Sequence, residues 1–183
     1  MKSIAKICVA VFLLMGVMAN EAHAQGGIGL YGAGARLFYV NPEDVEATLG
    51  FGAFANLGQI GENMSLEAML DFWSKSAKEA GLGASFRDLA IMGVVKYMFG
   101  ASDGQLQPYA LAGAGLHFLS VEVDLGFLGS ASDTETKIGI DAGAGVVYML
   151  NERMDIIAEI KYRLVSDLNQ LVISVGGSFA LGQ

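Results

Sequence analysis

The sequence predicts an all-β protein: an eight-stranded antiparallel up-and-down transmembrane β-barrel, preceded by a cleaved signal peptide. Three observations predict this fold. Apolar residues alternate with period two in eight runs, the pattern of strands with two different faces. One face of all eight runs carries no charged residue, and many of the 25 glycines share the other face with the charges. Glycines and charges fit the narrow interior of an eight-stranded barrel, and the uncharged face fits lipid.

The first 24 residues are predicted to be the signal peptide. Lys2 and Lys6 precede an apolar stretch, Ile7–Met18, and residues 22–24 (AHA) form a small-x-small cleavage site. The apolar stretch is too short to span a bilayer as a helix. We therefore expect Sec-type export, cleavage after Ala24 and a single barrel domain over residues 25–183. The only cysteine, Cys8, lies in the part that is removed, so no disulfide is expected.

The eight runs are bounded by turn residues and define the predicted strands. The clearest run is the seventh, in which Ile156 and Ile160 fall on one face while Glu159, Lys161 and Arg163 fall on the other. The predicted strands cover about residues 27–40, 45–57, 63–73, 87–99, 107–119, 136–150, 153–165 and 169–181.

The charged face predicts a polar network inside the barrel. Buried charges are costly unless they are paired, so the four cations are expected to pair with carboxylates across the lumen. Glu46, Asp88 and Asp155 share this face. The predicted lumenal charge network consists of Arg36, Glu67, Asp71, Lys96, His117, Asp141, Glu159, Lys161 and Arg163.

Aromatic residues on the uncharged face sort toward the two ends of the strands. Such belts mark the two membrane interfaces of a transmembrane barrel. One predicted girdle contains Tyr31, Tyr97, Phe99, Tyr148 and Phe179, and the other contains Tyr39, Phe72, Phe118 and Tyr162.

Connection lengths predict the orientation of the barrel. Three connections at one end are short, as periplasmic turns are. At the other end, the loops Ser74–Phe86 and Ser120–Glu135 are long enough to present a surface, and a helical turn is expected over Lys75–Ala80. The sequence does not indicate what these two loops bind.

Three segments carry a family resemblance. QPYALAGAGLHF (107–118), KIGIDAGAGVVYML (137–150) and VISVGGSFALG (172–182) are similar to strands of the small outer-membrane β-barrel family, which is related to opacity proteins and to the transmembrane domain of OmpA. The resemblance implies residence in the outer membrane of a Gram-negative-type bacterium. It also implies contact with outer-membrane lipids, lipopolysaccharide and the barrel-assembly machinery. The oligomeric state is left open, with a monomer expected.

Several function classes are disfavoured. A net charge of −8 argues against a nucleic-acid partner. His117 has no serine on its own strand face, so we expect no enzyme activity, and no cofactor or metal site is expected. We expect a structural or surface-presentation role. The alternatives are a narrow channel for small solutes or ions, a soluble lipid-binding barrel of inverted polarity, and a lipid-modifying enzyme.

Overall fold

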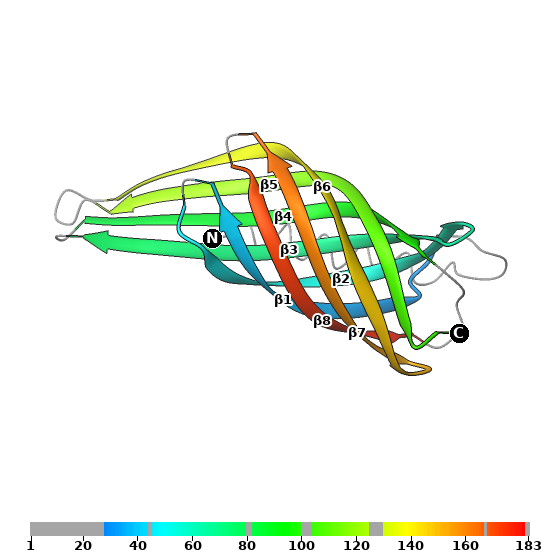
Figure 1. Ribbon diagram of the computed structural model, residues 1–183. Helices are drawn as coiled ribbons and strands as arrows, with labels where there is room; N and C mark the ends of the chain where they lie inside the picture. The colour runs from blue at the N-terminus through cyan, green and yellow to red at the C-terminus, as the bar shows by residue number, and fades with distance from the viewer. Residues whose placement is uncertain are drawn as a thin grey trace.

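The computed structural model describes residues 28–43, 45–79, 82–99, 104–124, 130–166 and 168–181. The predicted signal peptide, residues 1–24, lies outside them. Every strand pairs antiparallel with the next, and β8 pairs with β1 to close the barrel (Figure 1), which confirms the predicted fold class. The strands are β1 (Gly32–Pro42), β2 (Thr48–Gly61), β3 (Met64–Glu79), β4 (Leu82–Met98), β5 (Leu106–Asp124), β6 (Ser130–Asn151), β7 (Met154–Val165) and β8 (Gln170–Ala180).

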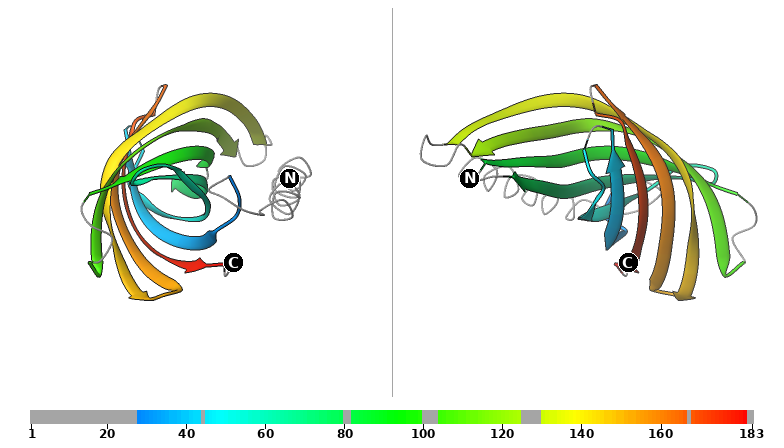
Figure 2. Two further views of the ribbon diagram at one scale, coloured as in Figure 1. Left: turned by 90° about the vertical axis from the view of Figure 1, so that its right-hand side faces the viewer. Right: turned by 60° about the vertical axis from the view of Figure 1, so that its left-hand side comes forward.

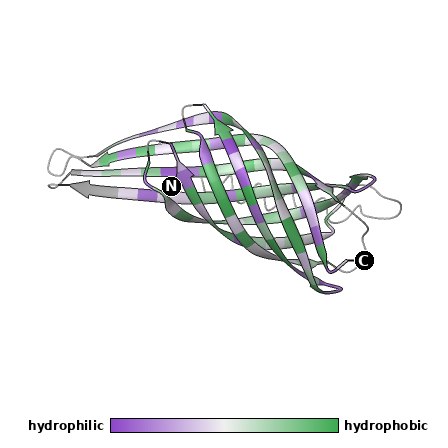
Figure 3. Ribbon diagram, in the orientation of Figure 1, coloured by the Kyte–Doolittle hydropathy of each residue, from purple (hydrophilic) through white to green (hydrophobic). Residues whose placement is uncertain are grey.

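The charged face of the strands points into the barrel and the uncharged face points outward, as the alternation predicts. Along β7 the residues are alternately exposed and buried, and the buried ones include Glu159, Lys161 and Arg163. The outward residues include Leu37 and Val175, which are 66% and 56% exposed. Hydrophobic and hydrophilic bands therefore follow one another along the strands (Figure 3). Apolar residues that would form the core of a soluble barrel instead cover the outside of this one.

Four strands are longer than predicted. β3, β4, β5 and β6 continue past the ends of their neighbours and project from one end of the barrel as a curved sheet (Figures 1 and 2). The last pair between β2 and β3 joins Gly50 to Trp73, and the last pair between β6 and β7 joins Gly139 to Val165. We call the part beyond these pairs the strand extension: residues 74–79, 82–87, 120–124 and 130–138.

The strand extension corrects the prediction of two long loops. Most of Ser74–Phe86 and of Ser120–Glu135 is paired strand, and the helical turn predicted over Lys75–Ala80 is wrong, because β3 continues to Glu79. The polar composition of these segments suggested loops. On the sides that face a neighbouring strand, their backbone groups are satisfied instead by the ladders.

Above Ile138 at its base, the outer face of the strand extension is polar, unlike the outer face of the barrel below it. Cross-strand pairs on this face join Ser76 to Ser85 through their hydroxyls and Arg87 to Glu122 through an ion pair of 3.2 Å. The Ser120 and Thr134 hydroxyls form a similar pair at 2.9 Å. Such groups lose hydration in hydrocarbon, so the apolar band ends where the strand extension begins. Among the described residues, no helix is long and apolar enough to cross a membrane.

Candidate functional site

Asp71 is the centre of the charges inside the barrel. Its carboxylate accepts hydrogen bonds from Arg36 Nη2 at 2.7 Å and Arg163 Nη2 at 2.8 Å, and Lys161 Nζ lies 3.6 Å away. Arg163 Nε donates to Asp141 at 2.8 Å, and Lys161 Nζ lies 3.0 Å from Asp141. These five side chains come from β1, β3, β6 and β7 and are almost fully buried. Their ion pairs therefore connect opposite walls of the barrel.

A second group of charges lies around Lys96. Its ammonium is 2.8 Å from Glu67 and 3.6 Å from Glu159, and it lies 4.7 Å from the centre of the Tyr109 ring. Glu159 also lies 3.4 Å from Arg36 Nη1, which links this group to Asp71. Eight of the nine residues of the predicted network therefore form one set of ion pairs.

His117, the ninth residue, belongs to a separate cluster around Asp88. Its Nδ1 lies 3.0 Å from both carboxylate oxygens of Asp88, which also accepts hydrogen bonds from Trp73 Nε1 at 3.2 Å and Gln170 Nε2 at 3.0 Å. His117 and Gln170 are fully buried. The sequence puts Asp88 on the charged face, although the predicted network does not include it, and no sequence pattern points to Trp73 or Gln170.

Glycines make room for the large lumenal side chains. The His117 ring lies against Gly139, where a Cβ atom would be 2.5 Å from ring atoms Cδ2 and Nε2. A Cβ atom at Gly145 would be 2.6 Å from the Tyr109 hydroxyl and the Ala158 carbonyl oxygen. At these two glycines, a large side chain of an adjacent strand thus occupies the space that a Cβ atom would need.

The lumen also contains apolar side chains, which the prediction of a polar network omitted. They lie at inward positions of the strands, as the buried charges do, and form two clusters. One cluster contains Phe38, Val40, Trp73 and Val172. The other contains Phe54, Met69, Ala90, Met92, Val94, Tyr109, Leu111, Val147 and Ile157.

The remaining expectations about sites concern acidic residues, aromatics, catalysis and metals. Glu46 is exposed and pairs with Lys75, and the half-buried Asp155 accepts a hydrogen bond from Ser178. Among the described residues, no serine is hydrogen bonded to His117 and no group of His, Cys, Asp and Glu could hold a metal ion.

The aromatic residues of the two predicted girdles differ in exposure. Exposed are Tyr39, Tyr97, Phe99, Tyr148, Tyr162 and Phe179, and half-buried are Phe72, Phe118 and Tyr31.

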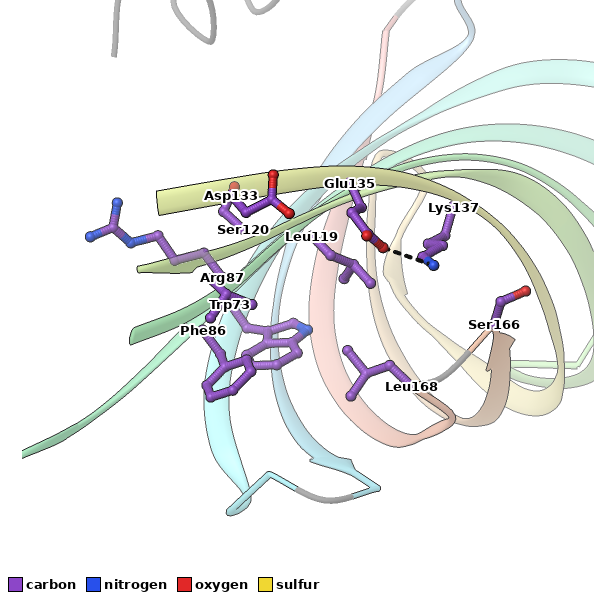
Figure 4. Close-up of a pocket in the computed structure, with 11 residues that line it drawn as sticks. Trp73, Phe86, Arg87, Leu119, Ser120, Asp133, Glu135, Lys137, Ser166 and Leu168 are labelled. Atoms are coloured by element: carbon purple, nitrogen blue, oxygen red, sulfur yellow. Dashed lines mark ion pairs between the residues drawn. The ribbon is translucent and has the colours of Figure 1, made fainter. Parts of the chain in front are cut away.

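A pocket of about 460 Å³ lies at the mouth of the barrel, on the inner side of the strand extension. Figure 4 shows Leu119 of β5 and Leu168 of the β7–β8 turn pointing toward one another across it, with Trp73 and Phe86 beside them. The charged lining residues include Asp133, Glu135 and Lys137 of β6, the last two joined by an ion pair of 2.8 Å. Sequence reasoning missed this pocket because it assigned its walls to loops.

Known proteins resemble this chain in fold. Neisserial surface protein A matches with a TM-score of 0.63 and 19% identity over 82% of this chain and 97% of that chain. Ail, the attachment invasion locus protein of Yersinia pestis, matches at 0.59 and 14%, over 86% and 100%. A major outer membrane protein from Thermus thermophilus matches at 0.62 and 8%, over 87% and 100%. No curated protein matches the sequence.

The sequence also matches one protein family over almost its whole length. The profile of the outer membrane protein beta-barrel domain aligns with residues 7–179, which include all but the last residue of β8. The closed eight-stranded barrel agrees with that match. The chain therefore belongs to the outer membrane protein beta-barrel domain family.

Proposed function

We propose that this protein is a surface-display barrel of the outer membrane of a Gram-negative-type bacterium. Its barrel anchors the protein, and its strand extension is held outside the cell as a rigid platform. The observation that carries the proposal is the change of the outer face from apolar on the barrel to polar on the strand extension. A segment with serine pairs and an ion pair on its outer face belongs in water, and a continuous sheet holds it at a fixed distance from the membrane.

The lumen has a structural role in this proposal. Its ion pairs and apolar clusters fill the interior and hold the opposite walls together. The outward aromatics would rest at the two lipid interfaces, next to outer-membrane lipids and lipopolysaccharide, after export by the Sec route and insertion by the barrel-assembly machinery. The other candidate, a narrow ion channel, requires a wet path past Arg36 and Lys96. The buried ion pairs of these residues favour the structural role.

Cysteine labelling on intact cells tests the display role. The only native cysteine lies in the predicted signal peptide, so single cysteines at Ser132 and Glu152 are unique reporters. Ser132 lies in the strand extension and Glu152 in the β6–β7 turn at the opposite end of the barrel. A membrane-impermeant maleimide should label Ser132→Cys on intact cells, and Glu152→Cys only after the outer membrane is permeabilised. The reverse pattern, or no labelling of either until permeabilisation, would refute display at the surface.

Single-channel recording separates display from transport. We expect the refolded protein, verified by a mobility shift between unheated and boiled samples, to give no stable conductance in planar bilayers. Steady conductance steps that change when Lys96 is replaced by methionine would favour the channel.

A further inference from the structure

The pocket at the mouth of the barrel has a largely apolar lining. Leu119 and Leu168 face one another across it, with Phe86, Val121 and the buried Trp73 beside them (Figure 4). Phe86 and Val121 are exposed, although they lie on strands whose outer face is polar. Apolar surface that a ligand removes from water contributes to binding, and pockets of about 300–1,000 Å³ hold small molecules. The volume of about 460 Å³ is therefore sufficient for a small organic molecule.

The strand register places carboxylates beside this apolar lining. Phe86 pairs with Val121, and Val121 pairs with Asp133, so these side chains form one row across β4, β5 and β6. In the next inward-facing row toward the barrel, Leu119 pairs with Glu135. Directly opposed residues have Cβ atoms about 4.5–5.5 Å apart. A ligand whose body covers the apolar residues would therefore have its end group next to a carboxylate.

The charges of the lining leave one carboxylate without a cation. Glu135 is paired with Lys137 at 2.8 Å. Arg87 is paired with Glu122 at 3.2 Å and points away from the two leucines in Figure 4. Asp133 is exposed and accepts a hydrogen bond from the next backbone N–H, and no cation of the described chain pairs with it. Both cations of the lining thus have carboxylate partners, whereas Asp133 can still accept one.

This charge distribution selects the chemical class of the ligand. An ammonium group can donate charge-assisted hydrogen bonds to Asp133, and such bonds are stronger than those between neutral groups. An anionic group in the same place would lie beside Asp133 and Glu135, and like charges repel one another. The net charge of the chain, −8, also attracts cations and repels anions before contact. The pocket therefore favours a cation over an anion or a neutral molecule of the same shape.

We infer that the mouth pocket binds small organic cations in which an ammonium group is attached to an aromatic or aliphatic body. The ammonium group is bound at Asp133. The body covers Val121 and Phe86 and extends between Leu119 and Leu168. This inference goes beyond the proposed function, since a surface-display role requires no ligand in the pocket.

Ligand titration of the refolded full barrel in detergent tests the inference. The probe is the ω-phenylbutylammonium ion. Two molecules of the same shape serve as controls: ω-phenylbutanol, which has a hydroxyl in place of the ammonium group, and ω-phenylbutanoate, which has the opposite charge. Binding is followed by the fluorescence of Trp73, because this residue lines the pocket and is the only tryptophan.

Three variants test the two parts of the pocket. Asp133→Asn removes the charge and keeps the size of the side chain, and Leu168→Gln makes the apolar part polar. Glu152→Gln is the matched control, because it removes one exposed carboxylate charge from the β6–β7 turn at the opposite end of the barrel.

We expect the ammonium probe to bind the wild-type barrel more tightly than the alcohol, and the alcohol more tightly than the carboxylate. Asp133→Asn should weaken binding of the ammonium probe by about three-fold or more and leave that of the alcohol within about two-fold, since only the ion pair is lost. Leu168→Gln should weaken binding of both molecules, because both have the same apolar body. Glu152→Gln should have no measurable effect, since salt screens charges that are farther apart than about 10 Å.

Four results would overturn the inference: no response to the ammonium probe, equal binding of the alcohol, unchanged binding in Asp133→Asn, or the same response in Leu168→Gln as in the wild type. The last of these would mean that the probe enters the detergent and not the pocket. The titration does not depend on the side of the membrane that the pocket faces, so failure of ligand binding and failure of surface labelling are distinguishable. A mobility shift on heating verifies that each variant is folded before its binding is measured.

Discussion

Replacement of Asp71 by asparagine should be among the most destabilising polar substitutions in this barrel. The variant keeps the size of the side chain but removes the charge that Arg36 and Arg163 share, at 2.7 and 2.8 Å. Both guanidinium groups are at most 3% exposed and cannot turn to water. Removal of one partner from a buried ion pair costs about 3–5 kcal/mol, because the other charge stays buried without compensation.

The measurement is reversible urea unfolding in phospholipid vesicles, followed by the fluorescence of Trp73, the only tryptophan. Asp155→Asn is the matched control, because this half-buried carboxylate accepts a single hydrogen bond, from Ser178. Loss of that bond should cost no more than about 1.5 kcal/mol. Arg163 keeps its hydrogen bonds to Asp141 in Asp71→Asn, but the network is left with one more cation than carboxylates. Replacement of Arg163 by methionine in the Asp71→Asn background should therefore restore part of the stability, since it removes this excess charge. Equal stabilities of Asp71→Asn and Asp155→Asn would refute the view that paired charges hold the walls together.

Three further substitutions test other features of the fold. Gly145→Ala should reduce the free energy of unfolding by about 1–3 kcal/mol, because the added Cβ atom would overlap Tyr109 and a backbone carbonyl oxygen. Gly177→Ala is the control in the same urea titration. Its added Cβ atom would lie 3.5 Å from the nearest atom, so the free energy of unfolding should change little. Val175→Arg, on the outward face between the two groups of aromatics, should cost about 2–4 kcal/mol in vesicles if it faces lipid, and a cost near zero would contradict a membrane-facing exterior. Trp73→Ala should reduce the free energy of unfolding by about 3–5 kcal/mol, since it leaves a cavity and removes a donor to Asp88. If the variant loses its gel mobility shift at the same temperature as the wild type, that packing is refuted.

The sequence was sufficient for the fold because the outward face of every run is free of charge, while the charges and most glycines keep to the other face. In the seventh run, outward apolar residues separate Glu159, Lys161 and Arg163 from one another, and the structure buries all three. Glycine on the charged face identified the interior, for the reason that Gly139 illustrates: a side chain there would overlap the His117 ring. Both signals are local to one strand and its neighbour, so they can be read from a single sequence.

The features that the sequence did not predict depend on contacts between distant strands. The cluster around the Asp88 carboxylate combines β4 with Trp73 of β3 and Gln170 of β8, and nothing in the spacing of these residues brings them together.

The strand extension was missed for another reason. In water both faces of a strand can be polar, so segments such as SASDTET lose the alternation that marks strands within the membrane. Their structure is specified by the ladder with β5 instead.

The ion pairs that cross the lumen have a consequence for the lifetime of the folded barrel. Arg36 of β1 reaches Asp71 of β3 and Glu159 of β7, and Lys96 of β4 reaches Glu159, so these pairs can form only once the wall has curved and closed. Interactions that form after the rate-limiting step of folding slow unfolding and leave the folding rate almost unchanged. The lumenal charges should therefore slow the unfolding of the barrel. The folding rate should depend on the strands and the lipids, and the unfolding rate should depend on the ion pairs in the lumen.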